Sequence, residues 1–228
     1  MKKTMLTSAA AGLALAAGAW ADPPTDSVVQ TWNFGFELSP GGDSMDFAQF
    51  DTSTGNPNVT RELQKVIITI DVTIGASITA ENDNVEPAEF FGVNLTGLAT
   101  LDFGTLGASA AIIENETAPG GVAGSDGNPG SGPDFYDFGF VSGSDNDMDM
   151  TSDAATLAQF IGNGMMTATI AGSGGFAVSG ASNSTINVTD FGASGTVTIE
   201  YLYKLVPTPG SAALIGLAGV VAVGRRRR

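Results

Sequence analysis

The sequence predicts an all-β protein: an antiparallel β-sandwich of jelly-roll type, with a cleavable signal helix before it and a transmembrane-like helix after it. Apolar and polar residues alternate through most of the chain, and this period of two separates them onto the two faces of a strand. The alternating runs are short and are separated by turns, in a chain with 31 glycines. Between the two processed ends, only residues 154–161 suit a helix, with Asp153 as its N-cap. A closed barrel is the alternative that these patterns leave open.

The longest alternating run covers residues 66–81, where Val66 and Ile68 begin the apolar face. A helix would scatter these apolar residues around its whole surface, so the run is interpreted as a strand. We expect it to bend at Gly75, where it either passes to another sheet or continues after a bulge. Other strands are expected at 28–38, 45–50, 91–103, 108–112, 136–140, 166–170, 176–178, 186–188 and 197–205.

Two segments between the expected strands have the composition of loops. Residues 119–133 are rich in glycine, with Asp126-Gly127-Asn128-Pro129-Gly130 at their centre. Residues 142–153 are acidic, and we expect them to close the strand that begins at residue 136.

Residues 1–21 have the features of a secretory signal peptide. Two lysines precede an apolar run over residues 5–17, and Ala19 and Ala21 are the small residues that signal peptidase accepts. We expect cleavage before Asp22. The chain then divides into the signal peptide at 1–21, a β-sandwich domain at 22–205 and a sorting segment at 206–228.

Composition excludes several classes of function. Between the two processed ends, Arg61, Lys65 and Lys204 stand against all 24 acidic residues, which gives a net charge of −21. This charge argues against nucleic acid or an anionic membrane surface as a partner. The chain has no cysteine and no histidine, so disulfides, Cys/His zinc sites and Ser-His-Asp triads are excluded. Catalysis would depend on carboxylates, which are too abundant to single out a pair, so we expect no enzyme activity.

The last 23 residues form three parts in a fixed order. First come Val206, Pro207, Thr208, Pro209 and Gly210, whose prolines keep the backbone extended. Residues 211–223 are apolar, but a helix of this length spans only about 20 Å of a hydrocarbon core about 30 Å thick. The chain ends in Arg225, Arg226, Arg227 and Arg228, which resist transfer across the membrane and keep this end cytoplasmic.

This order of parts resembles the PEP-CTERM sorting signal of Gram-negative bacteria. The resemblance covers residues 206–228, and Thr208 stands where the name-giving motif has glutamate. It implies that a membrane cysteine transpeptidase, the exosortase, cuts the chain near its proline motif. A simple C-terminal membrane anchor is the alternative interpretation.

The body of the chain resembles a second family, the choice-of-anchor E domain of secreted β-rich proteins. Three stretches carry this resemblance: Phe47-Ala48-Gln49-Phe50-Asp51, Leu157-Ala158-Gln159-Phe160-Ile161-Gly162-Asn163-Gly164 and Gly195-Thr196-Val197-Thr198-Ile199-Glu200-Tyr201. The resemblance implies an exported β-rich domain with an alternative C-terminal anchor. It adds no catalytic residue.

A candidate calcium site lies in the acidic segment. Asp145, Asp147 and Asp149 place carboxylates at every second residue, and Asp153 follows closely. Calcium takes six to eight oxygen ligands, so these four residues are its candidate ligands. The segment lacks the glycine and the distal glutamate of an EF-hand loop, because methionine and threonine occupy those positions. A solvated acidic turn is the alternative, and it is the interpretation that we prefer.

Together these features predict an exported structural protein of the cell surface or extracellular matrix that an exosortase processes. Its expected partners are signal peptidase, the exosortase and exopolysaccharide, and its C-terminal helix engages the inner membrane before processing. A calcium-dependent adhesin or carbohydrate-binding module is a second hypothesis. A simple membrane-anchored surface protein is the third.

Overall fold

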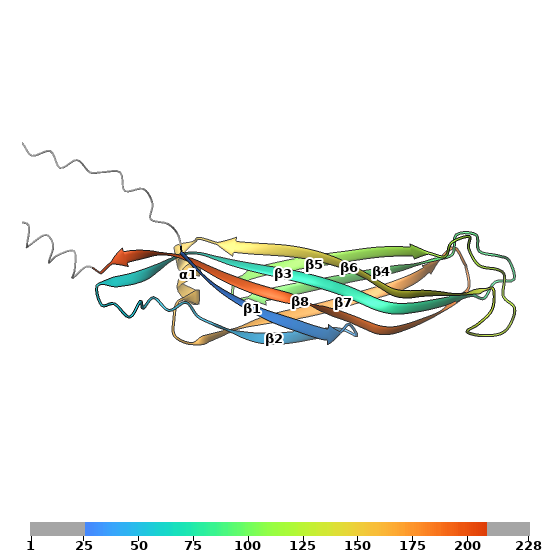
Figure 1. Ribbon diagram of the computed structural model, residues 1–228, viewed down its shortest axis with the longest axis horizontal. Helices are drawn as coiled ribbons and strands as arrows, with labels where there is room; N and C mark the ends of the chain where they lie inside the picture. Colours follow the sequence, from blue (N-terminus) through green and yellow to red (C-terminus); the bar gives the residue numbers. More distant parts are fainter. Residues whose placement is uncertain (1–25, 209–228) are drawn as a thin grey trace, which may run out of the picture.

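The computed structural model describes residues 26–208, which form an elongated body made almost entirely of strands (Figure 1). The elements are β1 (Asp26–Glu37), β2 (Gly41–Ala48), β3 (Val59–Asn82), β4 (Gly92–Phe103), β5 (Leu106–Thr117), β6 (Phe135–Thr151), α1 (Ala154–Phe160), β7 (Met165–Ser179) and β8 (Ser184–Pro207). They confirm the prediction of an all-β protein. The expected signal helix and the C-terminal apolar helix lie outside the described residues. Within residues 26–208 no helix has the length and apolar character needed to cross a membrane.

The strands form two four-stranded antiparallel sheets. The strand order is β1-β8-β3-β6 in one sheet and β2-β7-β4-β5 in the other. Strands β4 and β5 are joined by a tight turn at Gly104, whose φ of 66° favours glycine. Every other connection between consecutive strands in the described range crosses from one sheet to the other. The sheets are therefore built from pairings between distant parts of the chain.

The apolar faces of the two sheets pack against each other, as expected for a β-sandwich. A larger buried cluster surrounds Ile70, Phe103 and Tyr201 and includes Phe160 of helix α1. A smaller one surrounds Ile78, Phe91 and Val141. Strand β3 contributes side chains to both clusters. The core therefore follows the length of the body and extends under the long loops opposite α1 (Figure 1).

Strand β3 shows which of the two outcomes expected at Gly75 is correct. The strand stays in one sheet, and its register with β8 shifts between Gly75 and Ser77, so the chain continues after a bulge. A methyl group on Gly75 would come within 2.5 Å of the Phe140 ring on β6. The position therefore needs glycine because a neighbouring aromatic ring packs directly onto the backbone.

The acidic residues 142–153 correct the sequence prediction. They were expected to close a strand, but β6 continues through them to Thr151 and pairs with β3 throughout. Their alternation is a strand pattern with half-buried aspartates on one side and exposed methionines on the other. Two other pairs of predicted strands also merge: 166–170 with 176–178 into β7, and 186–188 with 197–205 into β8.

Helix α1 lies where the sequence predicts it and ends one residue earlier, at Phe160. Asp153 is its N-cap: Oδ2 accepts the backbone N–H of Thr156 at 2.9 Å and the Thr156 hydroxyl at 3.0 Å. These hydrogen bonds favour the carboxylate and lower the pKa of Asp153 below its usual value. Leu157 and Phe160 are buried and hold the helix on the core.

Tyr201 is expected to make folding stability depend on alkaline pH. Its side chain is fully buried and its hydroxyl donates to the carbonyl oxygen of Ala48 at 3.1 Å. Burial raises the pKa of Tyr201 to about 12. An unfolded chain ionises its tyrosines near a pKa of about 10, so the unfolded state loses this proton first. The raised pKa of Tyr201 therefore adds to the free energy of unfolding in full below about pH 10, and this contribution is lost as the pH rises toward 12.

Urea denaturation of the wild type and Tyr201→Phe at pH 8 to 12 measures this contribution. At pH 8 we expect the wild type to be more stable by about 1 kcal/mol, because the variant lacks one buried hydrogen bond. Above pH 10 the advantage should shrink, since phenylalanine cannot ionise. An advantage that stays constant across this range would contradict the prediction.

Candidate functional site

The described start of the sorting motif is part of the folded sheet. Val206 and Pro207 are the last residues of β8 and pair with Thr60 and Val59 of β3. The backbone N–H of Thr208 donates to the carbonyl oxygen of Asn58 at 3.0 Å, and its hydroxyl donates to Pro57 O at 3.1 Å. Pro209, Gly210 and the four terminal arginines lie outside the described residues, as do Ala19, Ala21 and Asp22. Val206 and Pro207 are extended because they belong to β8, where β3 holds them.

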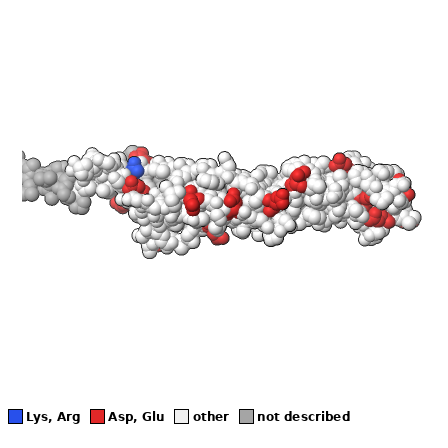
Figure 2. Space-filling view, turned by 90° about the horizontal axis from the view of Figure 1, so that it is seen from below, with Lys and Arg blue, Asp and Glu red and all other residues white. Residues whose placement is uncertain are grey.

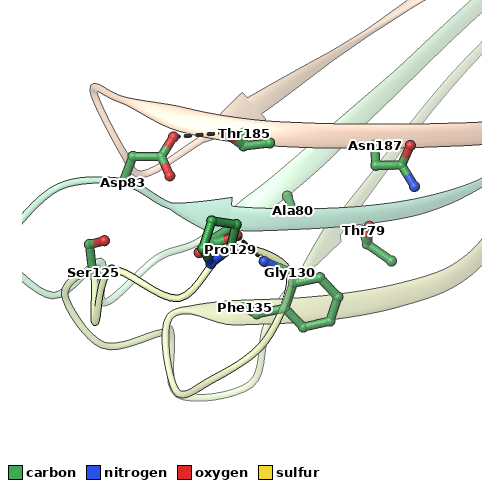
Figure 3. A pocket seen from close by; sticks show the side chains of 11 residues that line it. Thr79, Ala80, Asp83, Ser125, Pro129, Gly130, Phe135, Thr185 and Asn187 are labelled. Carbon is green, nitrogen blue, oxygen red and sulfur yellow. Dashed lines mark hydrogen bonds between the residues drawn. The ribbon is translucent and has the colours of Figure 1, made fainter.

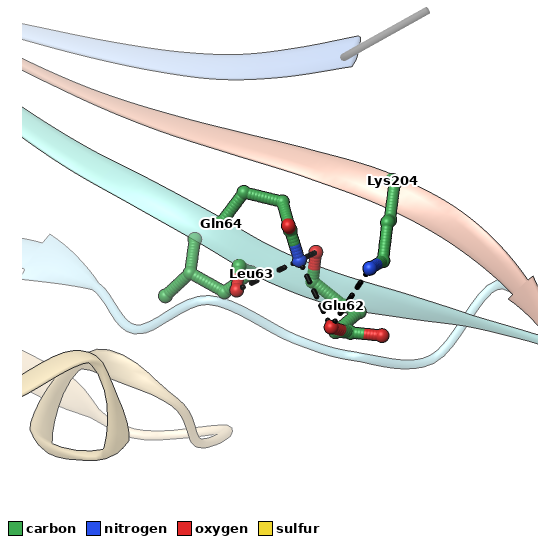
Figure 4. A network of polar contacts seen from close by, with 4 residues as sticks. All are labelled: Glu62, Leu63, Gln64 and Lys204. Atoms are coloured by element: carbon green, nitrogen blue, oxygen red, sulfur yellow. Dashed lines mark hydrogen bonds and ion pairs between the residues drawn. The ribbon is translucent and has the colours of Figure 1, made fainter. Parts of the chain in front are cut away.

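The strand that leads into the motif carries one of the three basic side chains of the body, Lys204. Lys204 forms an ion pair with Glu62 on β3, with 3.1 Å between Nζ and Oε1 (Figure 4). Gln64 donates to the same carboxylate oxygen at 3.1 Å. The hydrogen bond from Lys204, and then that from Gln64, lowers the pKa of Glu62 below its usual value. Glu62 is exposed and Lys204 is partly exposed, so the ion pair contributes little to the stability of the fold.

Charge is distributed unevenly along the body. Residues 26–208 contain three basic side chains, Arg61, Lys65 and Lys204, and all three lie near the motif, in the stretch where β3 pairs with β8. Figure 2 shows one face, with acidic side chains spread along its length and a basic one only near the end that carries the grey termini. The opposite end is therefore exclusively acidic within the described range.

The predicted calcium ligands on β6 have a different arrangement from a metal site. Asp145, Asp147 and Asp149 each use Oδ2 to accept one backbone N–H of β5. The three bonds run to Ala111 at 2.9 Å, Ser109 at 2.8 Å and Gly107 at 3.1 Å. Strand β6 is the edge of one sheet and β5 the edge of the other. We call this set of bonds the aspartate ladder: it links the two edges along one side of the sandwich.

The aspartate ladder spreads the predicted ligands along the strand. Alternate residues of a strand are about 6.8 Å apart, too far for three such carboxylates to surround one ion. The fourth residue, Asp153, caps helix α1 instead. Within residues 26–208 no group of three or more Asp, Glu, His or Cys side chains could hold a metal ion. The structure thus does not bring the four residues together, and they do not form the predicted solvated turn either.

A cavity of about 590 Å³ lies at the end of the body opposite the motif (Figure 3). Its floor comes from the ends of β3, β6 and β8, and one wall is the loop containing Ser125, Gly127, Pro129 and Gly130. Inside it Thr185 donates to Asp83 at 3.0 Å. Phe135 offers an aromatic ring, while Thr79 and Asn187 offer polar groups. This size and lining suit a small polar ligand.

Three buried polar residues organise the loops around this cavity: Glu81, Asn82 and Asp134. Asn82 donates to the carbonyl oxygens of Glu86 and Ala123, both at 2.9 Å. Glu81 accepts the backbone N–H of Gly130 at 2.7 Å. Sequence analysis treated this region only as a glycine-rich loop, because the partners of these side chains lie up to 49 residues away.

The fold defines a class: an acidic β protein of two four-stranded antiparallel sheets. No family model and no curated protein matches the chain. Similar solved structures include the infectious bursal disease virus Gt strain, with 11% identity, a TM-score of 0.11 and coverage of 91% of this chain and 48% of that one. Another is the VP2 subviral particle of that virus, with 14% identity, a TM-score of 0.15 and coverage of 96% and 54%. The chain spans about half of those chains, and such low scores carry no argument about fold or function.

Proposed function

We propose that this is an exported structural protein of the cell surface or extracellular matrix, and that an exosortase processes its C-terminal sorting segment. The observation that carries the proposal is the position of the motif. Strand β8 runs directly into it, and Asp26, the first described residue, pairs with Tyr203 close by. Both ends of the described chain therefore leave from one end of an elongated body (Figure 1). Attached to a membrane there, the protein would project its whole length outward, with the loop-lined cavity farthest from the membrane.

The pairing of the motif supports processing without damage to the body. Contacts to β3 and to the two residues before it hold the chain up to Thr208, so a cut beyond that residue leaves every pair of β8 in place. Residues 211–228 could then be removed, and the displayed domain would keep its stability. The net charge of the body favours solubility and an association with neutral exopolysaccharide or basic partners rather than with anionic surfaces.

We infer a jelly-roll connectivity for the body. Eight strands form two four-stranded sheets, and all connections except β4 to β5 cross between the sheets. Two Greek keys wound in this way give the jelly roll, a frequent architecture for domains that display surfaces or bind ligands without catalysing a reaction.

Replacing both Pro207 and Pro209 by alanine is expected to block processing. The wild-type protein recovered from outside the cell should lack residues 211–228 by intact mass, whereas the variant should accumulate in the membrane with Arg228 still present. The reason is that proline disfavours a helix beyond the end of β8, and alanine at position 209 allows the expected apolar helix to extend back toward that end.

The matched control is Pro119→Ala, since Pro119 is an exposed loop proline far from the motif. It should be processed like the wild type. Thermal melting of the double variant checks that the body still folds. Exported wild-type protein that retains its terminal arginines would contradict the proposal and favour a permanent membrane anchor.

A further inference from the structure

We propose that the loop of residues 125–134 binds one calcium ion between the carboxylates of Asp126 and Asp134. The site lies beside the cavity at the end of the body farthest from the sorting motif. It is separate from the aspartate ladder, and it does not depend on how the C-terminus is processed.

The first observation is an unsatisfied buried carboxylate. Asp134 has no exposed surface, and its Oδ2 accepts the backbone N–H of Asp126 at 2.8 Å. Its Oδ1 is also buried but has no hydrogen-bond partner among residues 26–208. Removing a carboxylate oxygen from water without a partner costs free energy, so such atoms in folded proteins call for an ion, a water molecule or a proton.

The second observation is where this oxygen points. A methyl group on Gly132 would lie no more than 2.8 Å from both Oδ1 of Asp134 and Oδ2 of Asp126. Both oxygens therefore lie close to the same point in space, and the distance between them is less than twice 2.8 Å. Oxygens on opposite sides of a calcium ion are about 5 Å apart, and adjacent ones are closer. The pair is thus within the span of a single ion.

The charges around Asp126 and Asp134 favour a bound cation, because the described part of the chain places no basic side chain nearby to neutralise the two carboxylates. Glu81 is buried next to the same loop through its bond to Gly130, and Asp83 lines the adjoining cavity. The three basic residues of the described range all lie near the sorting motif. No side chain at this end of the described body can neutralise the carboxylates, so a divalent ion would relieve their mutual repulsion.

Calcium suits this loop better than magnesium. Two carboxylates leave several coordination positions for main-chain carbonyls and water, which calcium accepts in flexible geometry, whereas magnesium requires near-octahedral coordination. Gly127, Gly130 and Gly132 have positive φ values of 77°, 75° and 110°, so the backbone curves tightly around the two aspartates. The ion would fix the wall of the cavity formed by Ser125, Gly127, Pro129 and Gly130.

Calorimetric titration and thermal melting of the exported protein, first freed of metal with a chelator, test the site. We expect one calcium ion per chain and a rise in melting temperature of about 3–10 °C at 10 mM calcium chloride, from a millimolar to submillimolar site. Magnesium chloride at the same concentration should give a smaller rise. Both Asp126→Asn and Asp134→Asn should lose most of the rise.

Two controls make the outcome decisive. Asp145→Asn changes the same residue type in the aspartate ladder and should keep the full calcium response. Asp126 is exposed, so Asp126→Asn should fold even if the buried Asp134→Asn does not. The proposal is overturned by the absence of heat and of any melting shift. It is also overturned by a response that survives Asp126→Asn or disappears in Asp145→Asn.

Discussion

Replacing Phe103 by alanine is expected to lower the free energy of unfolding by about 3–5 kcal/mol, because it empties the centre of the larger core cluster. The Phe103 ring is fully buried. Its centroid lies 5.8 Å from that of Phe47 on β2 and 5.4 Å from that of Phe160 on α1. One side chain therefore joins two strands and the helix, and its loss leaves a cavity that these rigid elements cannot fill.

Urea denaturation followed by circular dichroism measures this loss. Phe90→Ala is the matched control, because Phe90 is 80% exposed and should change the unfolding free energy by less than about 0.5 kcal/mol. A loss below about 1 kcal/mol for Phe103→Ala would mean that the sheets close over the vacated space. The packing described for this part of the core would then be wrong.

Removing the aspartate ladder is expected to destabilise the protein by about 2–4 kcal/mol and to promote self-association. The triple replacement of Asp145, Asp147 and Asp149 by alanine deprives three N–H groups of β5 of their acceptors, at about 1 kcal/mol each. Water can hydrate these exposed groups, but an open strand edge can also pair with another molecule. Chemical denaturation and size-exclusion chromatography measure the two effects.

The control for the aspartate ladder removes the same number of charges elsewhere. Glu86, Glu89 and Glu116 are exposed, and their joint replacement by alanine should leave the elution volume and the stability close to those of the wild type. The isosteric change of all three ladder aspartates to asparagine should have an intermediate effect, since an amide oxygen can accept the same bonds without the charge. If both triple-alanine variants lost the same stability and self-associated equally, the change in net charge, and not the link between the sheet edges, would account for the lost stability.

The aspartate ladder also shows why sequence analysis misjudged the acidic segment. Carboxylates at every second residue match a metal loop in composition, but the same spacing is the period of a strand. Which interpretation holds depends on the edge strand β5, which lies 34–42 residues earlier in the chain. The alternation within residues 144–151 was the available signal, although its phase differs from that of the preceding aromatic residues because a bulge lies between Asp137 and Gly139.

The site at the opposite end was missed for a similar reason. The sequence predicts residues 119–133 as a glycine-rich loop, and no strand or helix lies there, but it gives no sign that Asp134 is buried. Burial of that carboxylate comes from the packing of the loops after β3 and before β6 around Asn82. A side chain that looks solvated in a polar, glycine-rich stretch becomes buried only when distant loops cover it.

The sequence by itself determined the strand content, the long β3 with its glycine and the capped helix. These are local properties: alternation, turn residues and caps act over a few neighbouring positions. The tertiary structure alone decided the order of strands and the pairing of Val206 and Pro207 with β3. It also decided the aspartate ladder and the burial of Asp134. These depend on contacts between segments tens of residues apart, and the pattern within a single strand does not specify its partner.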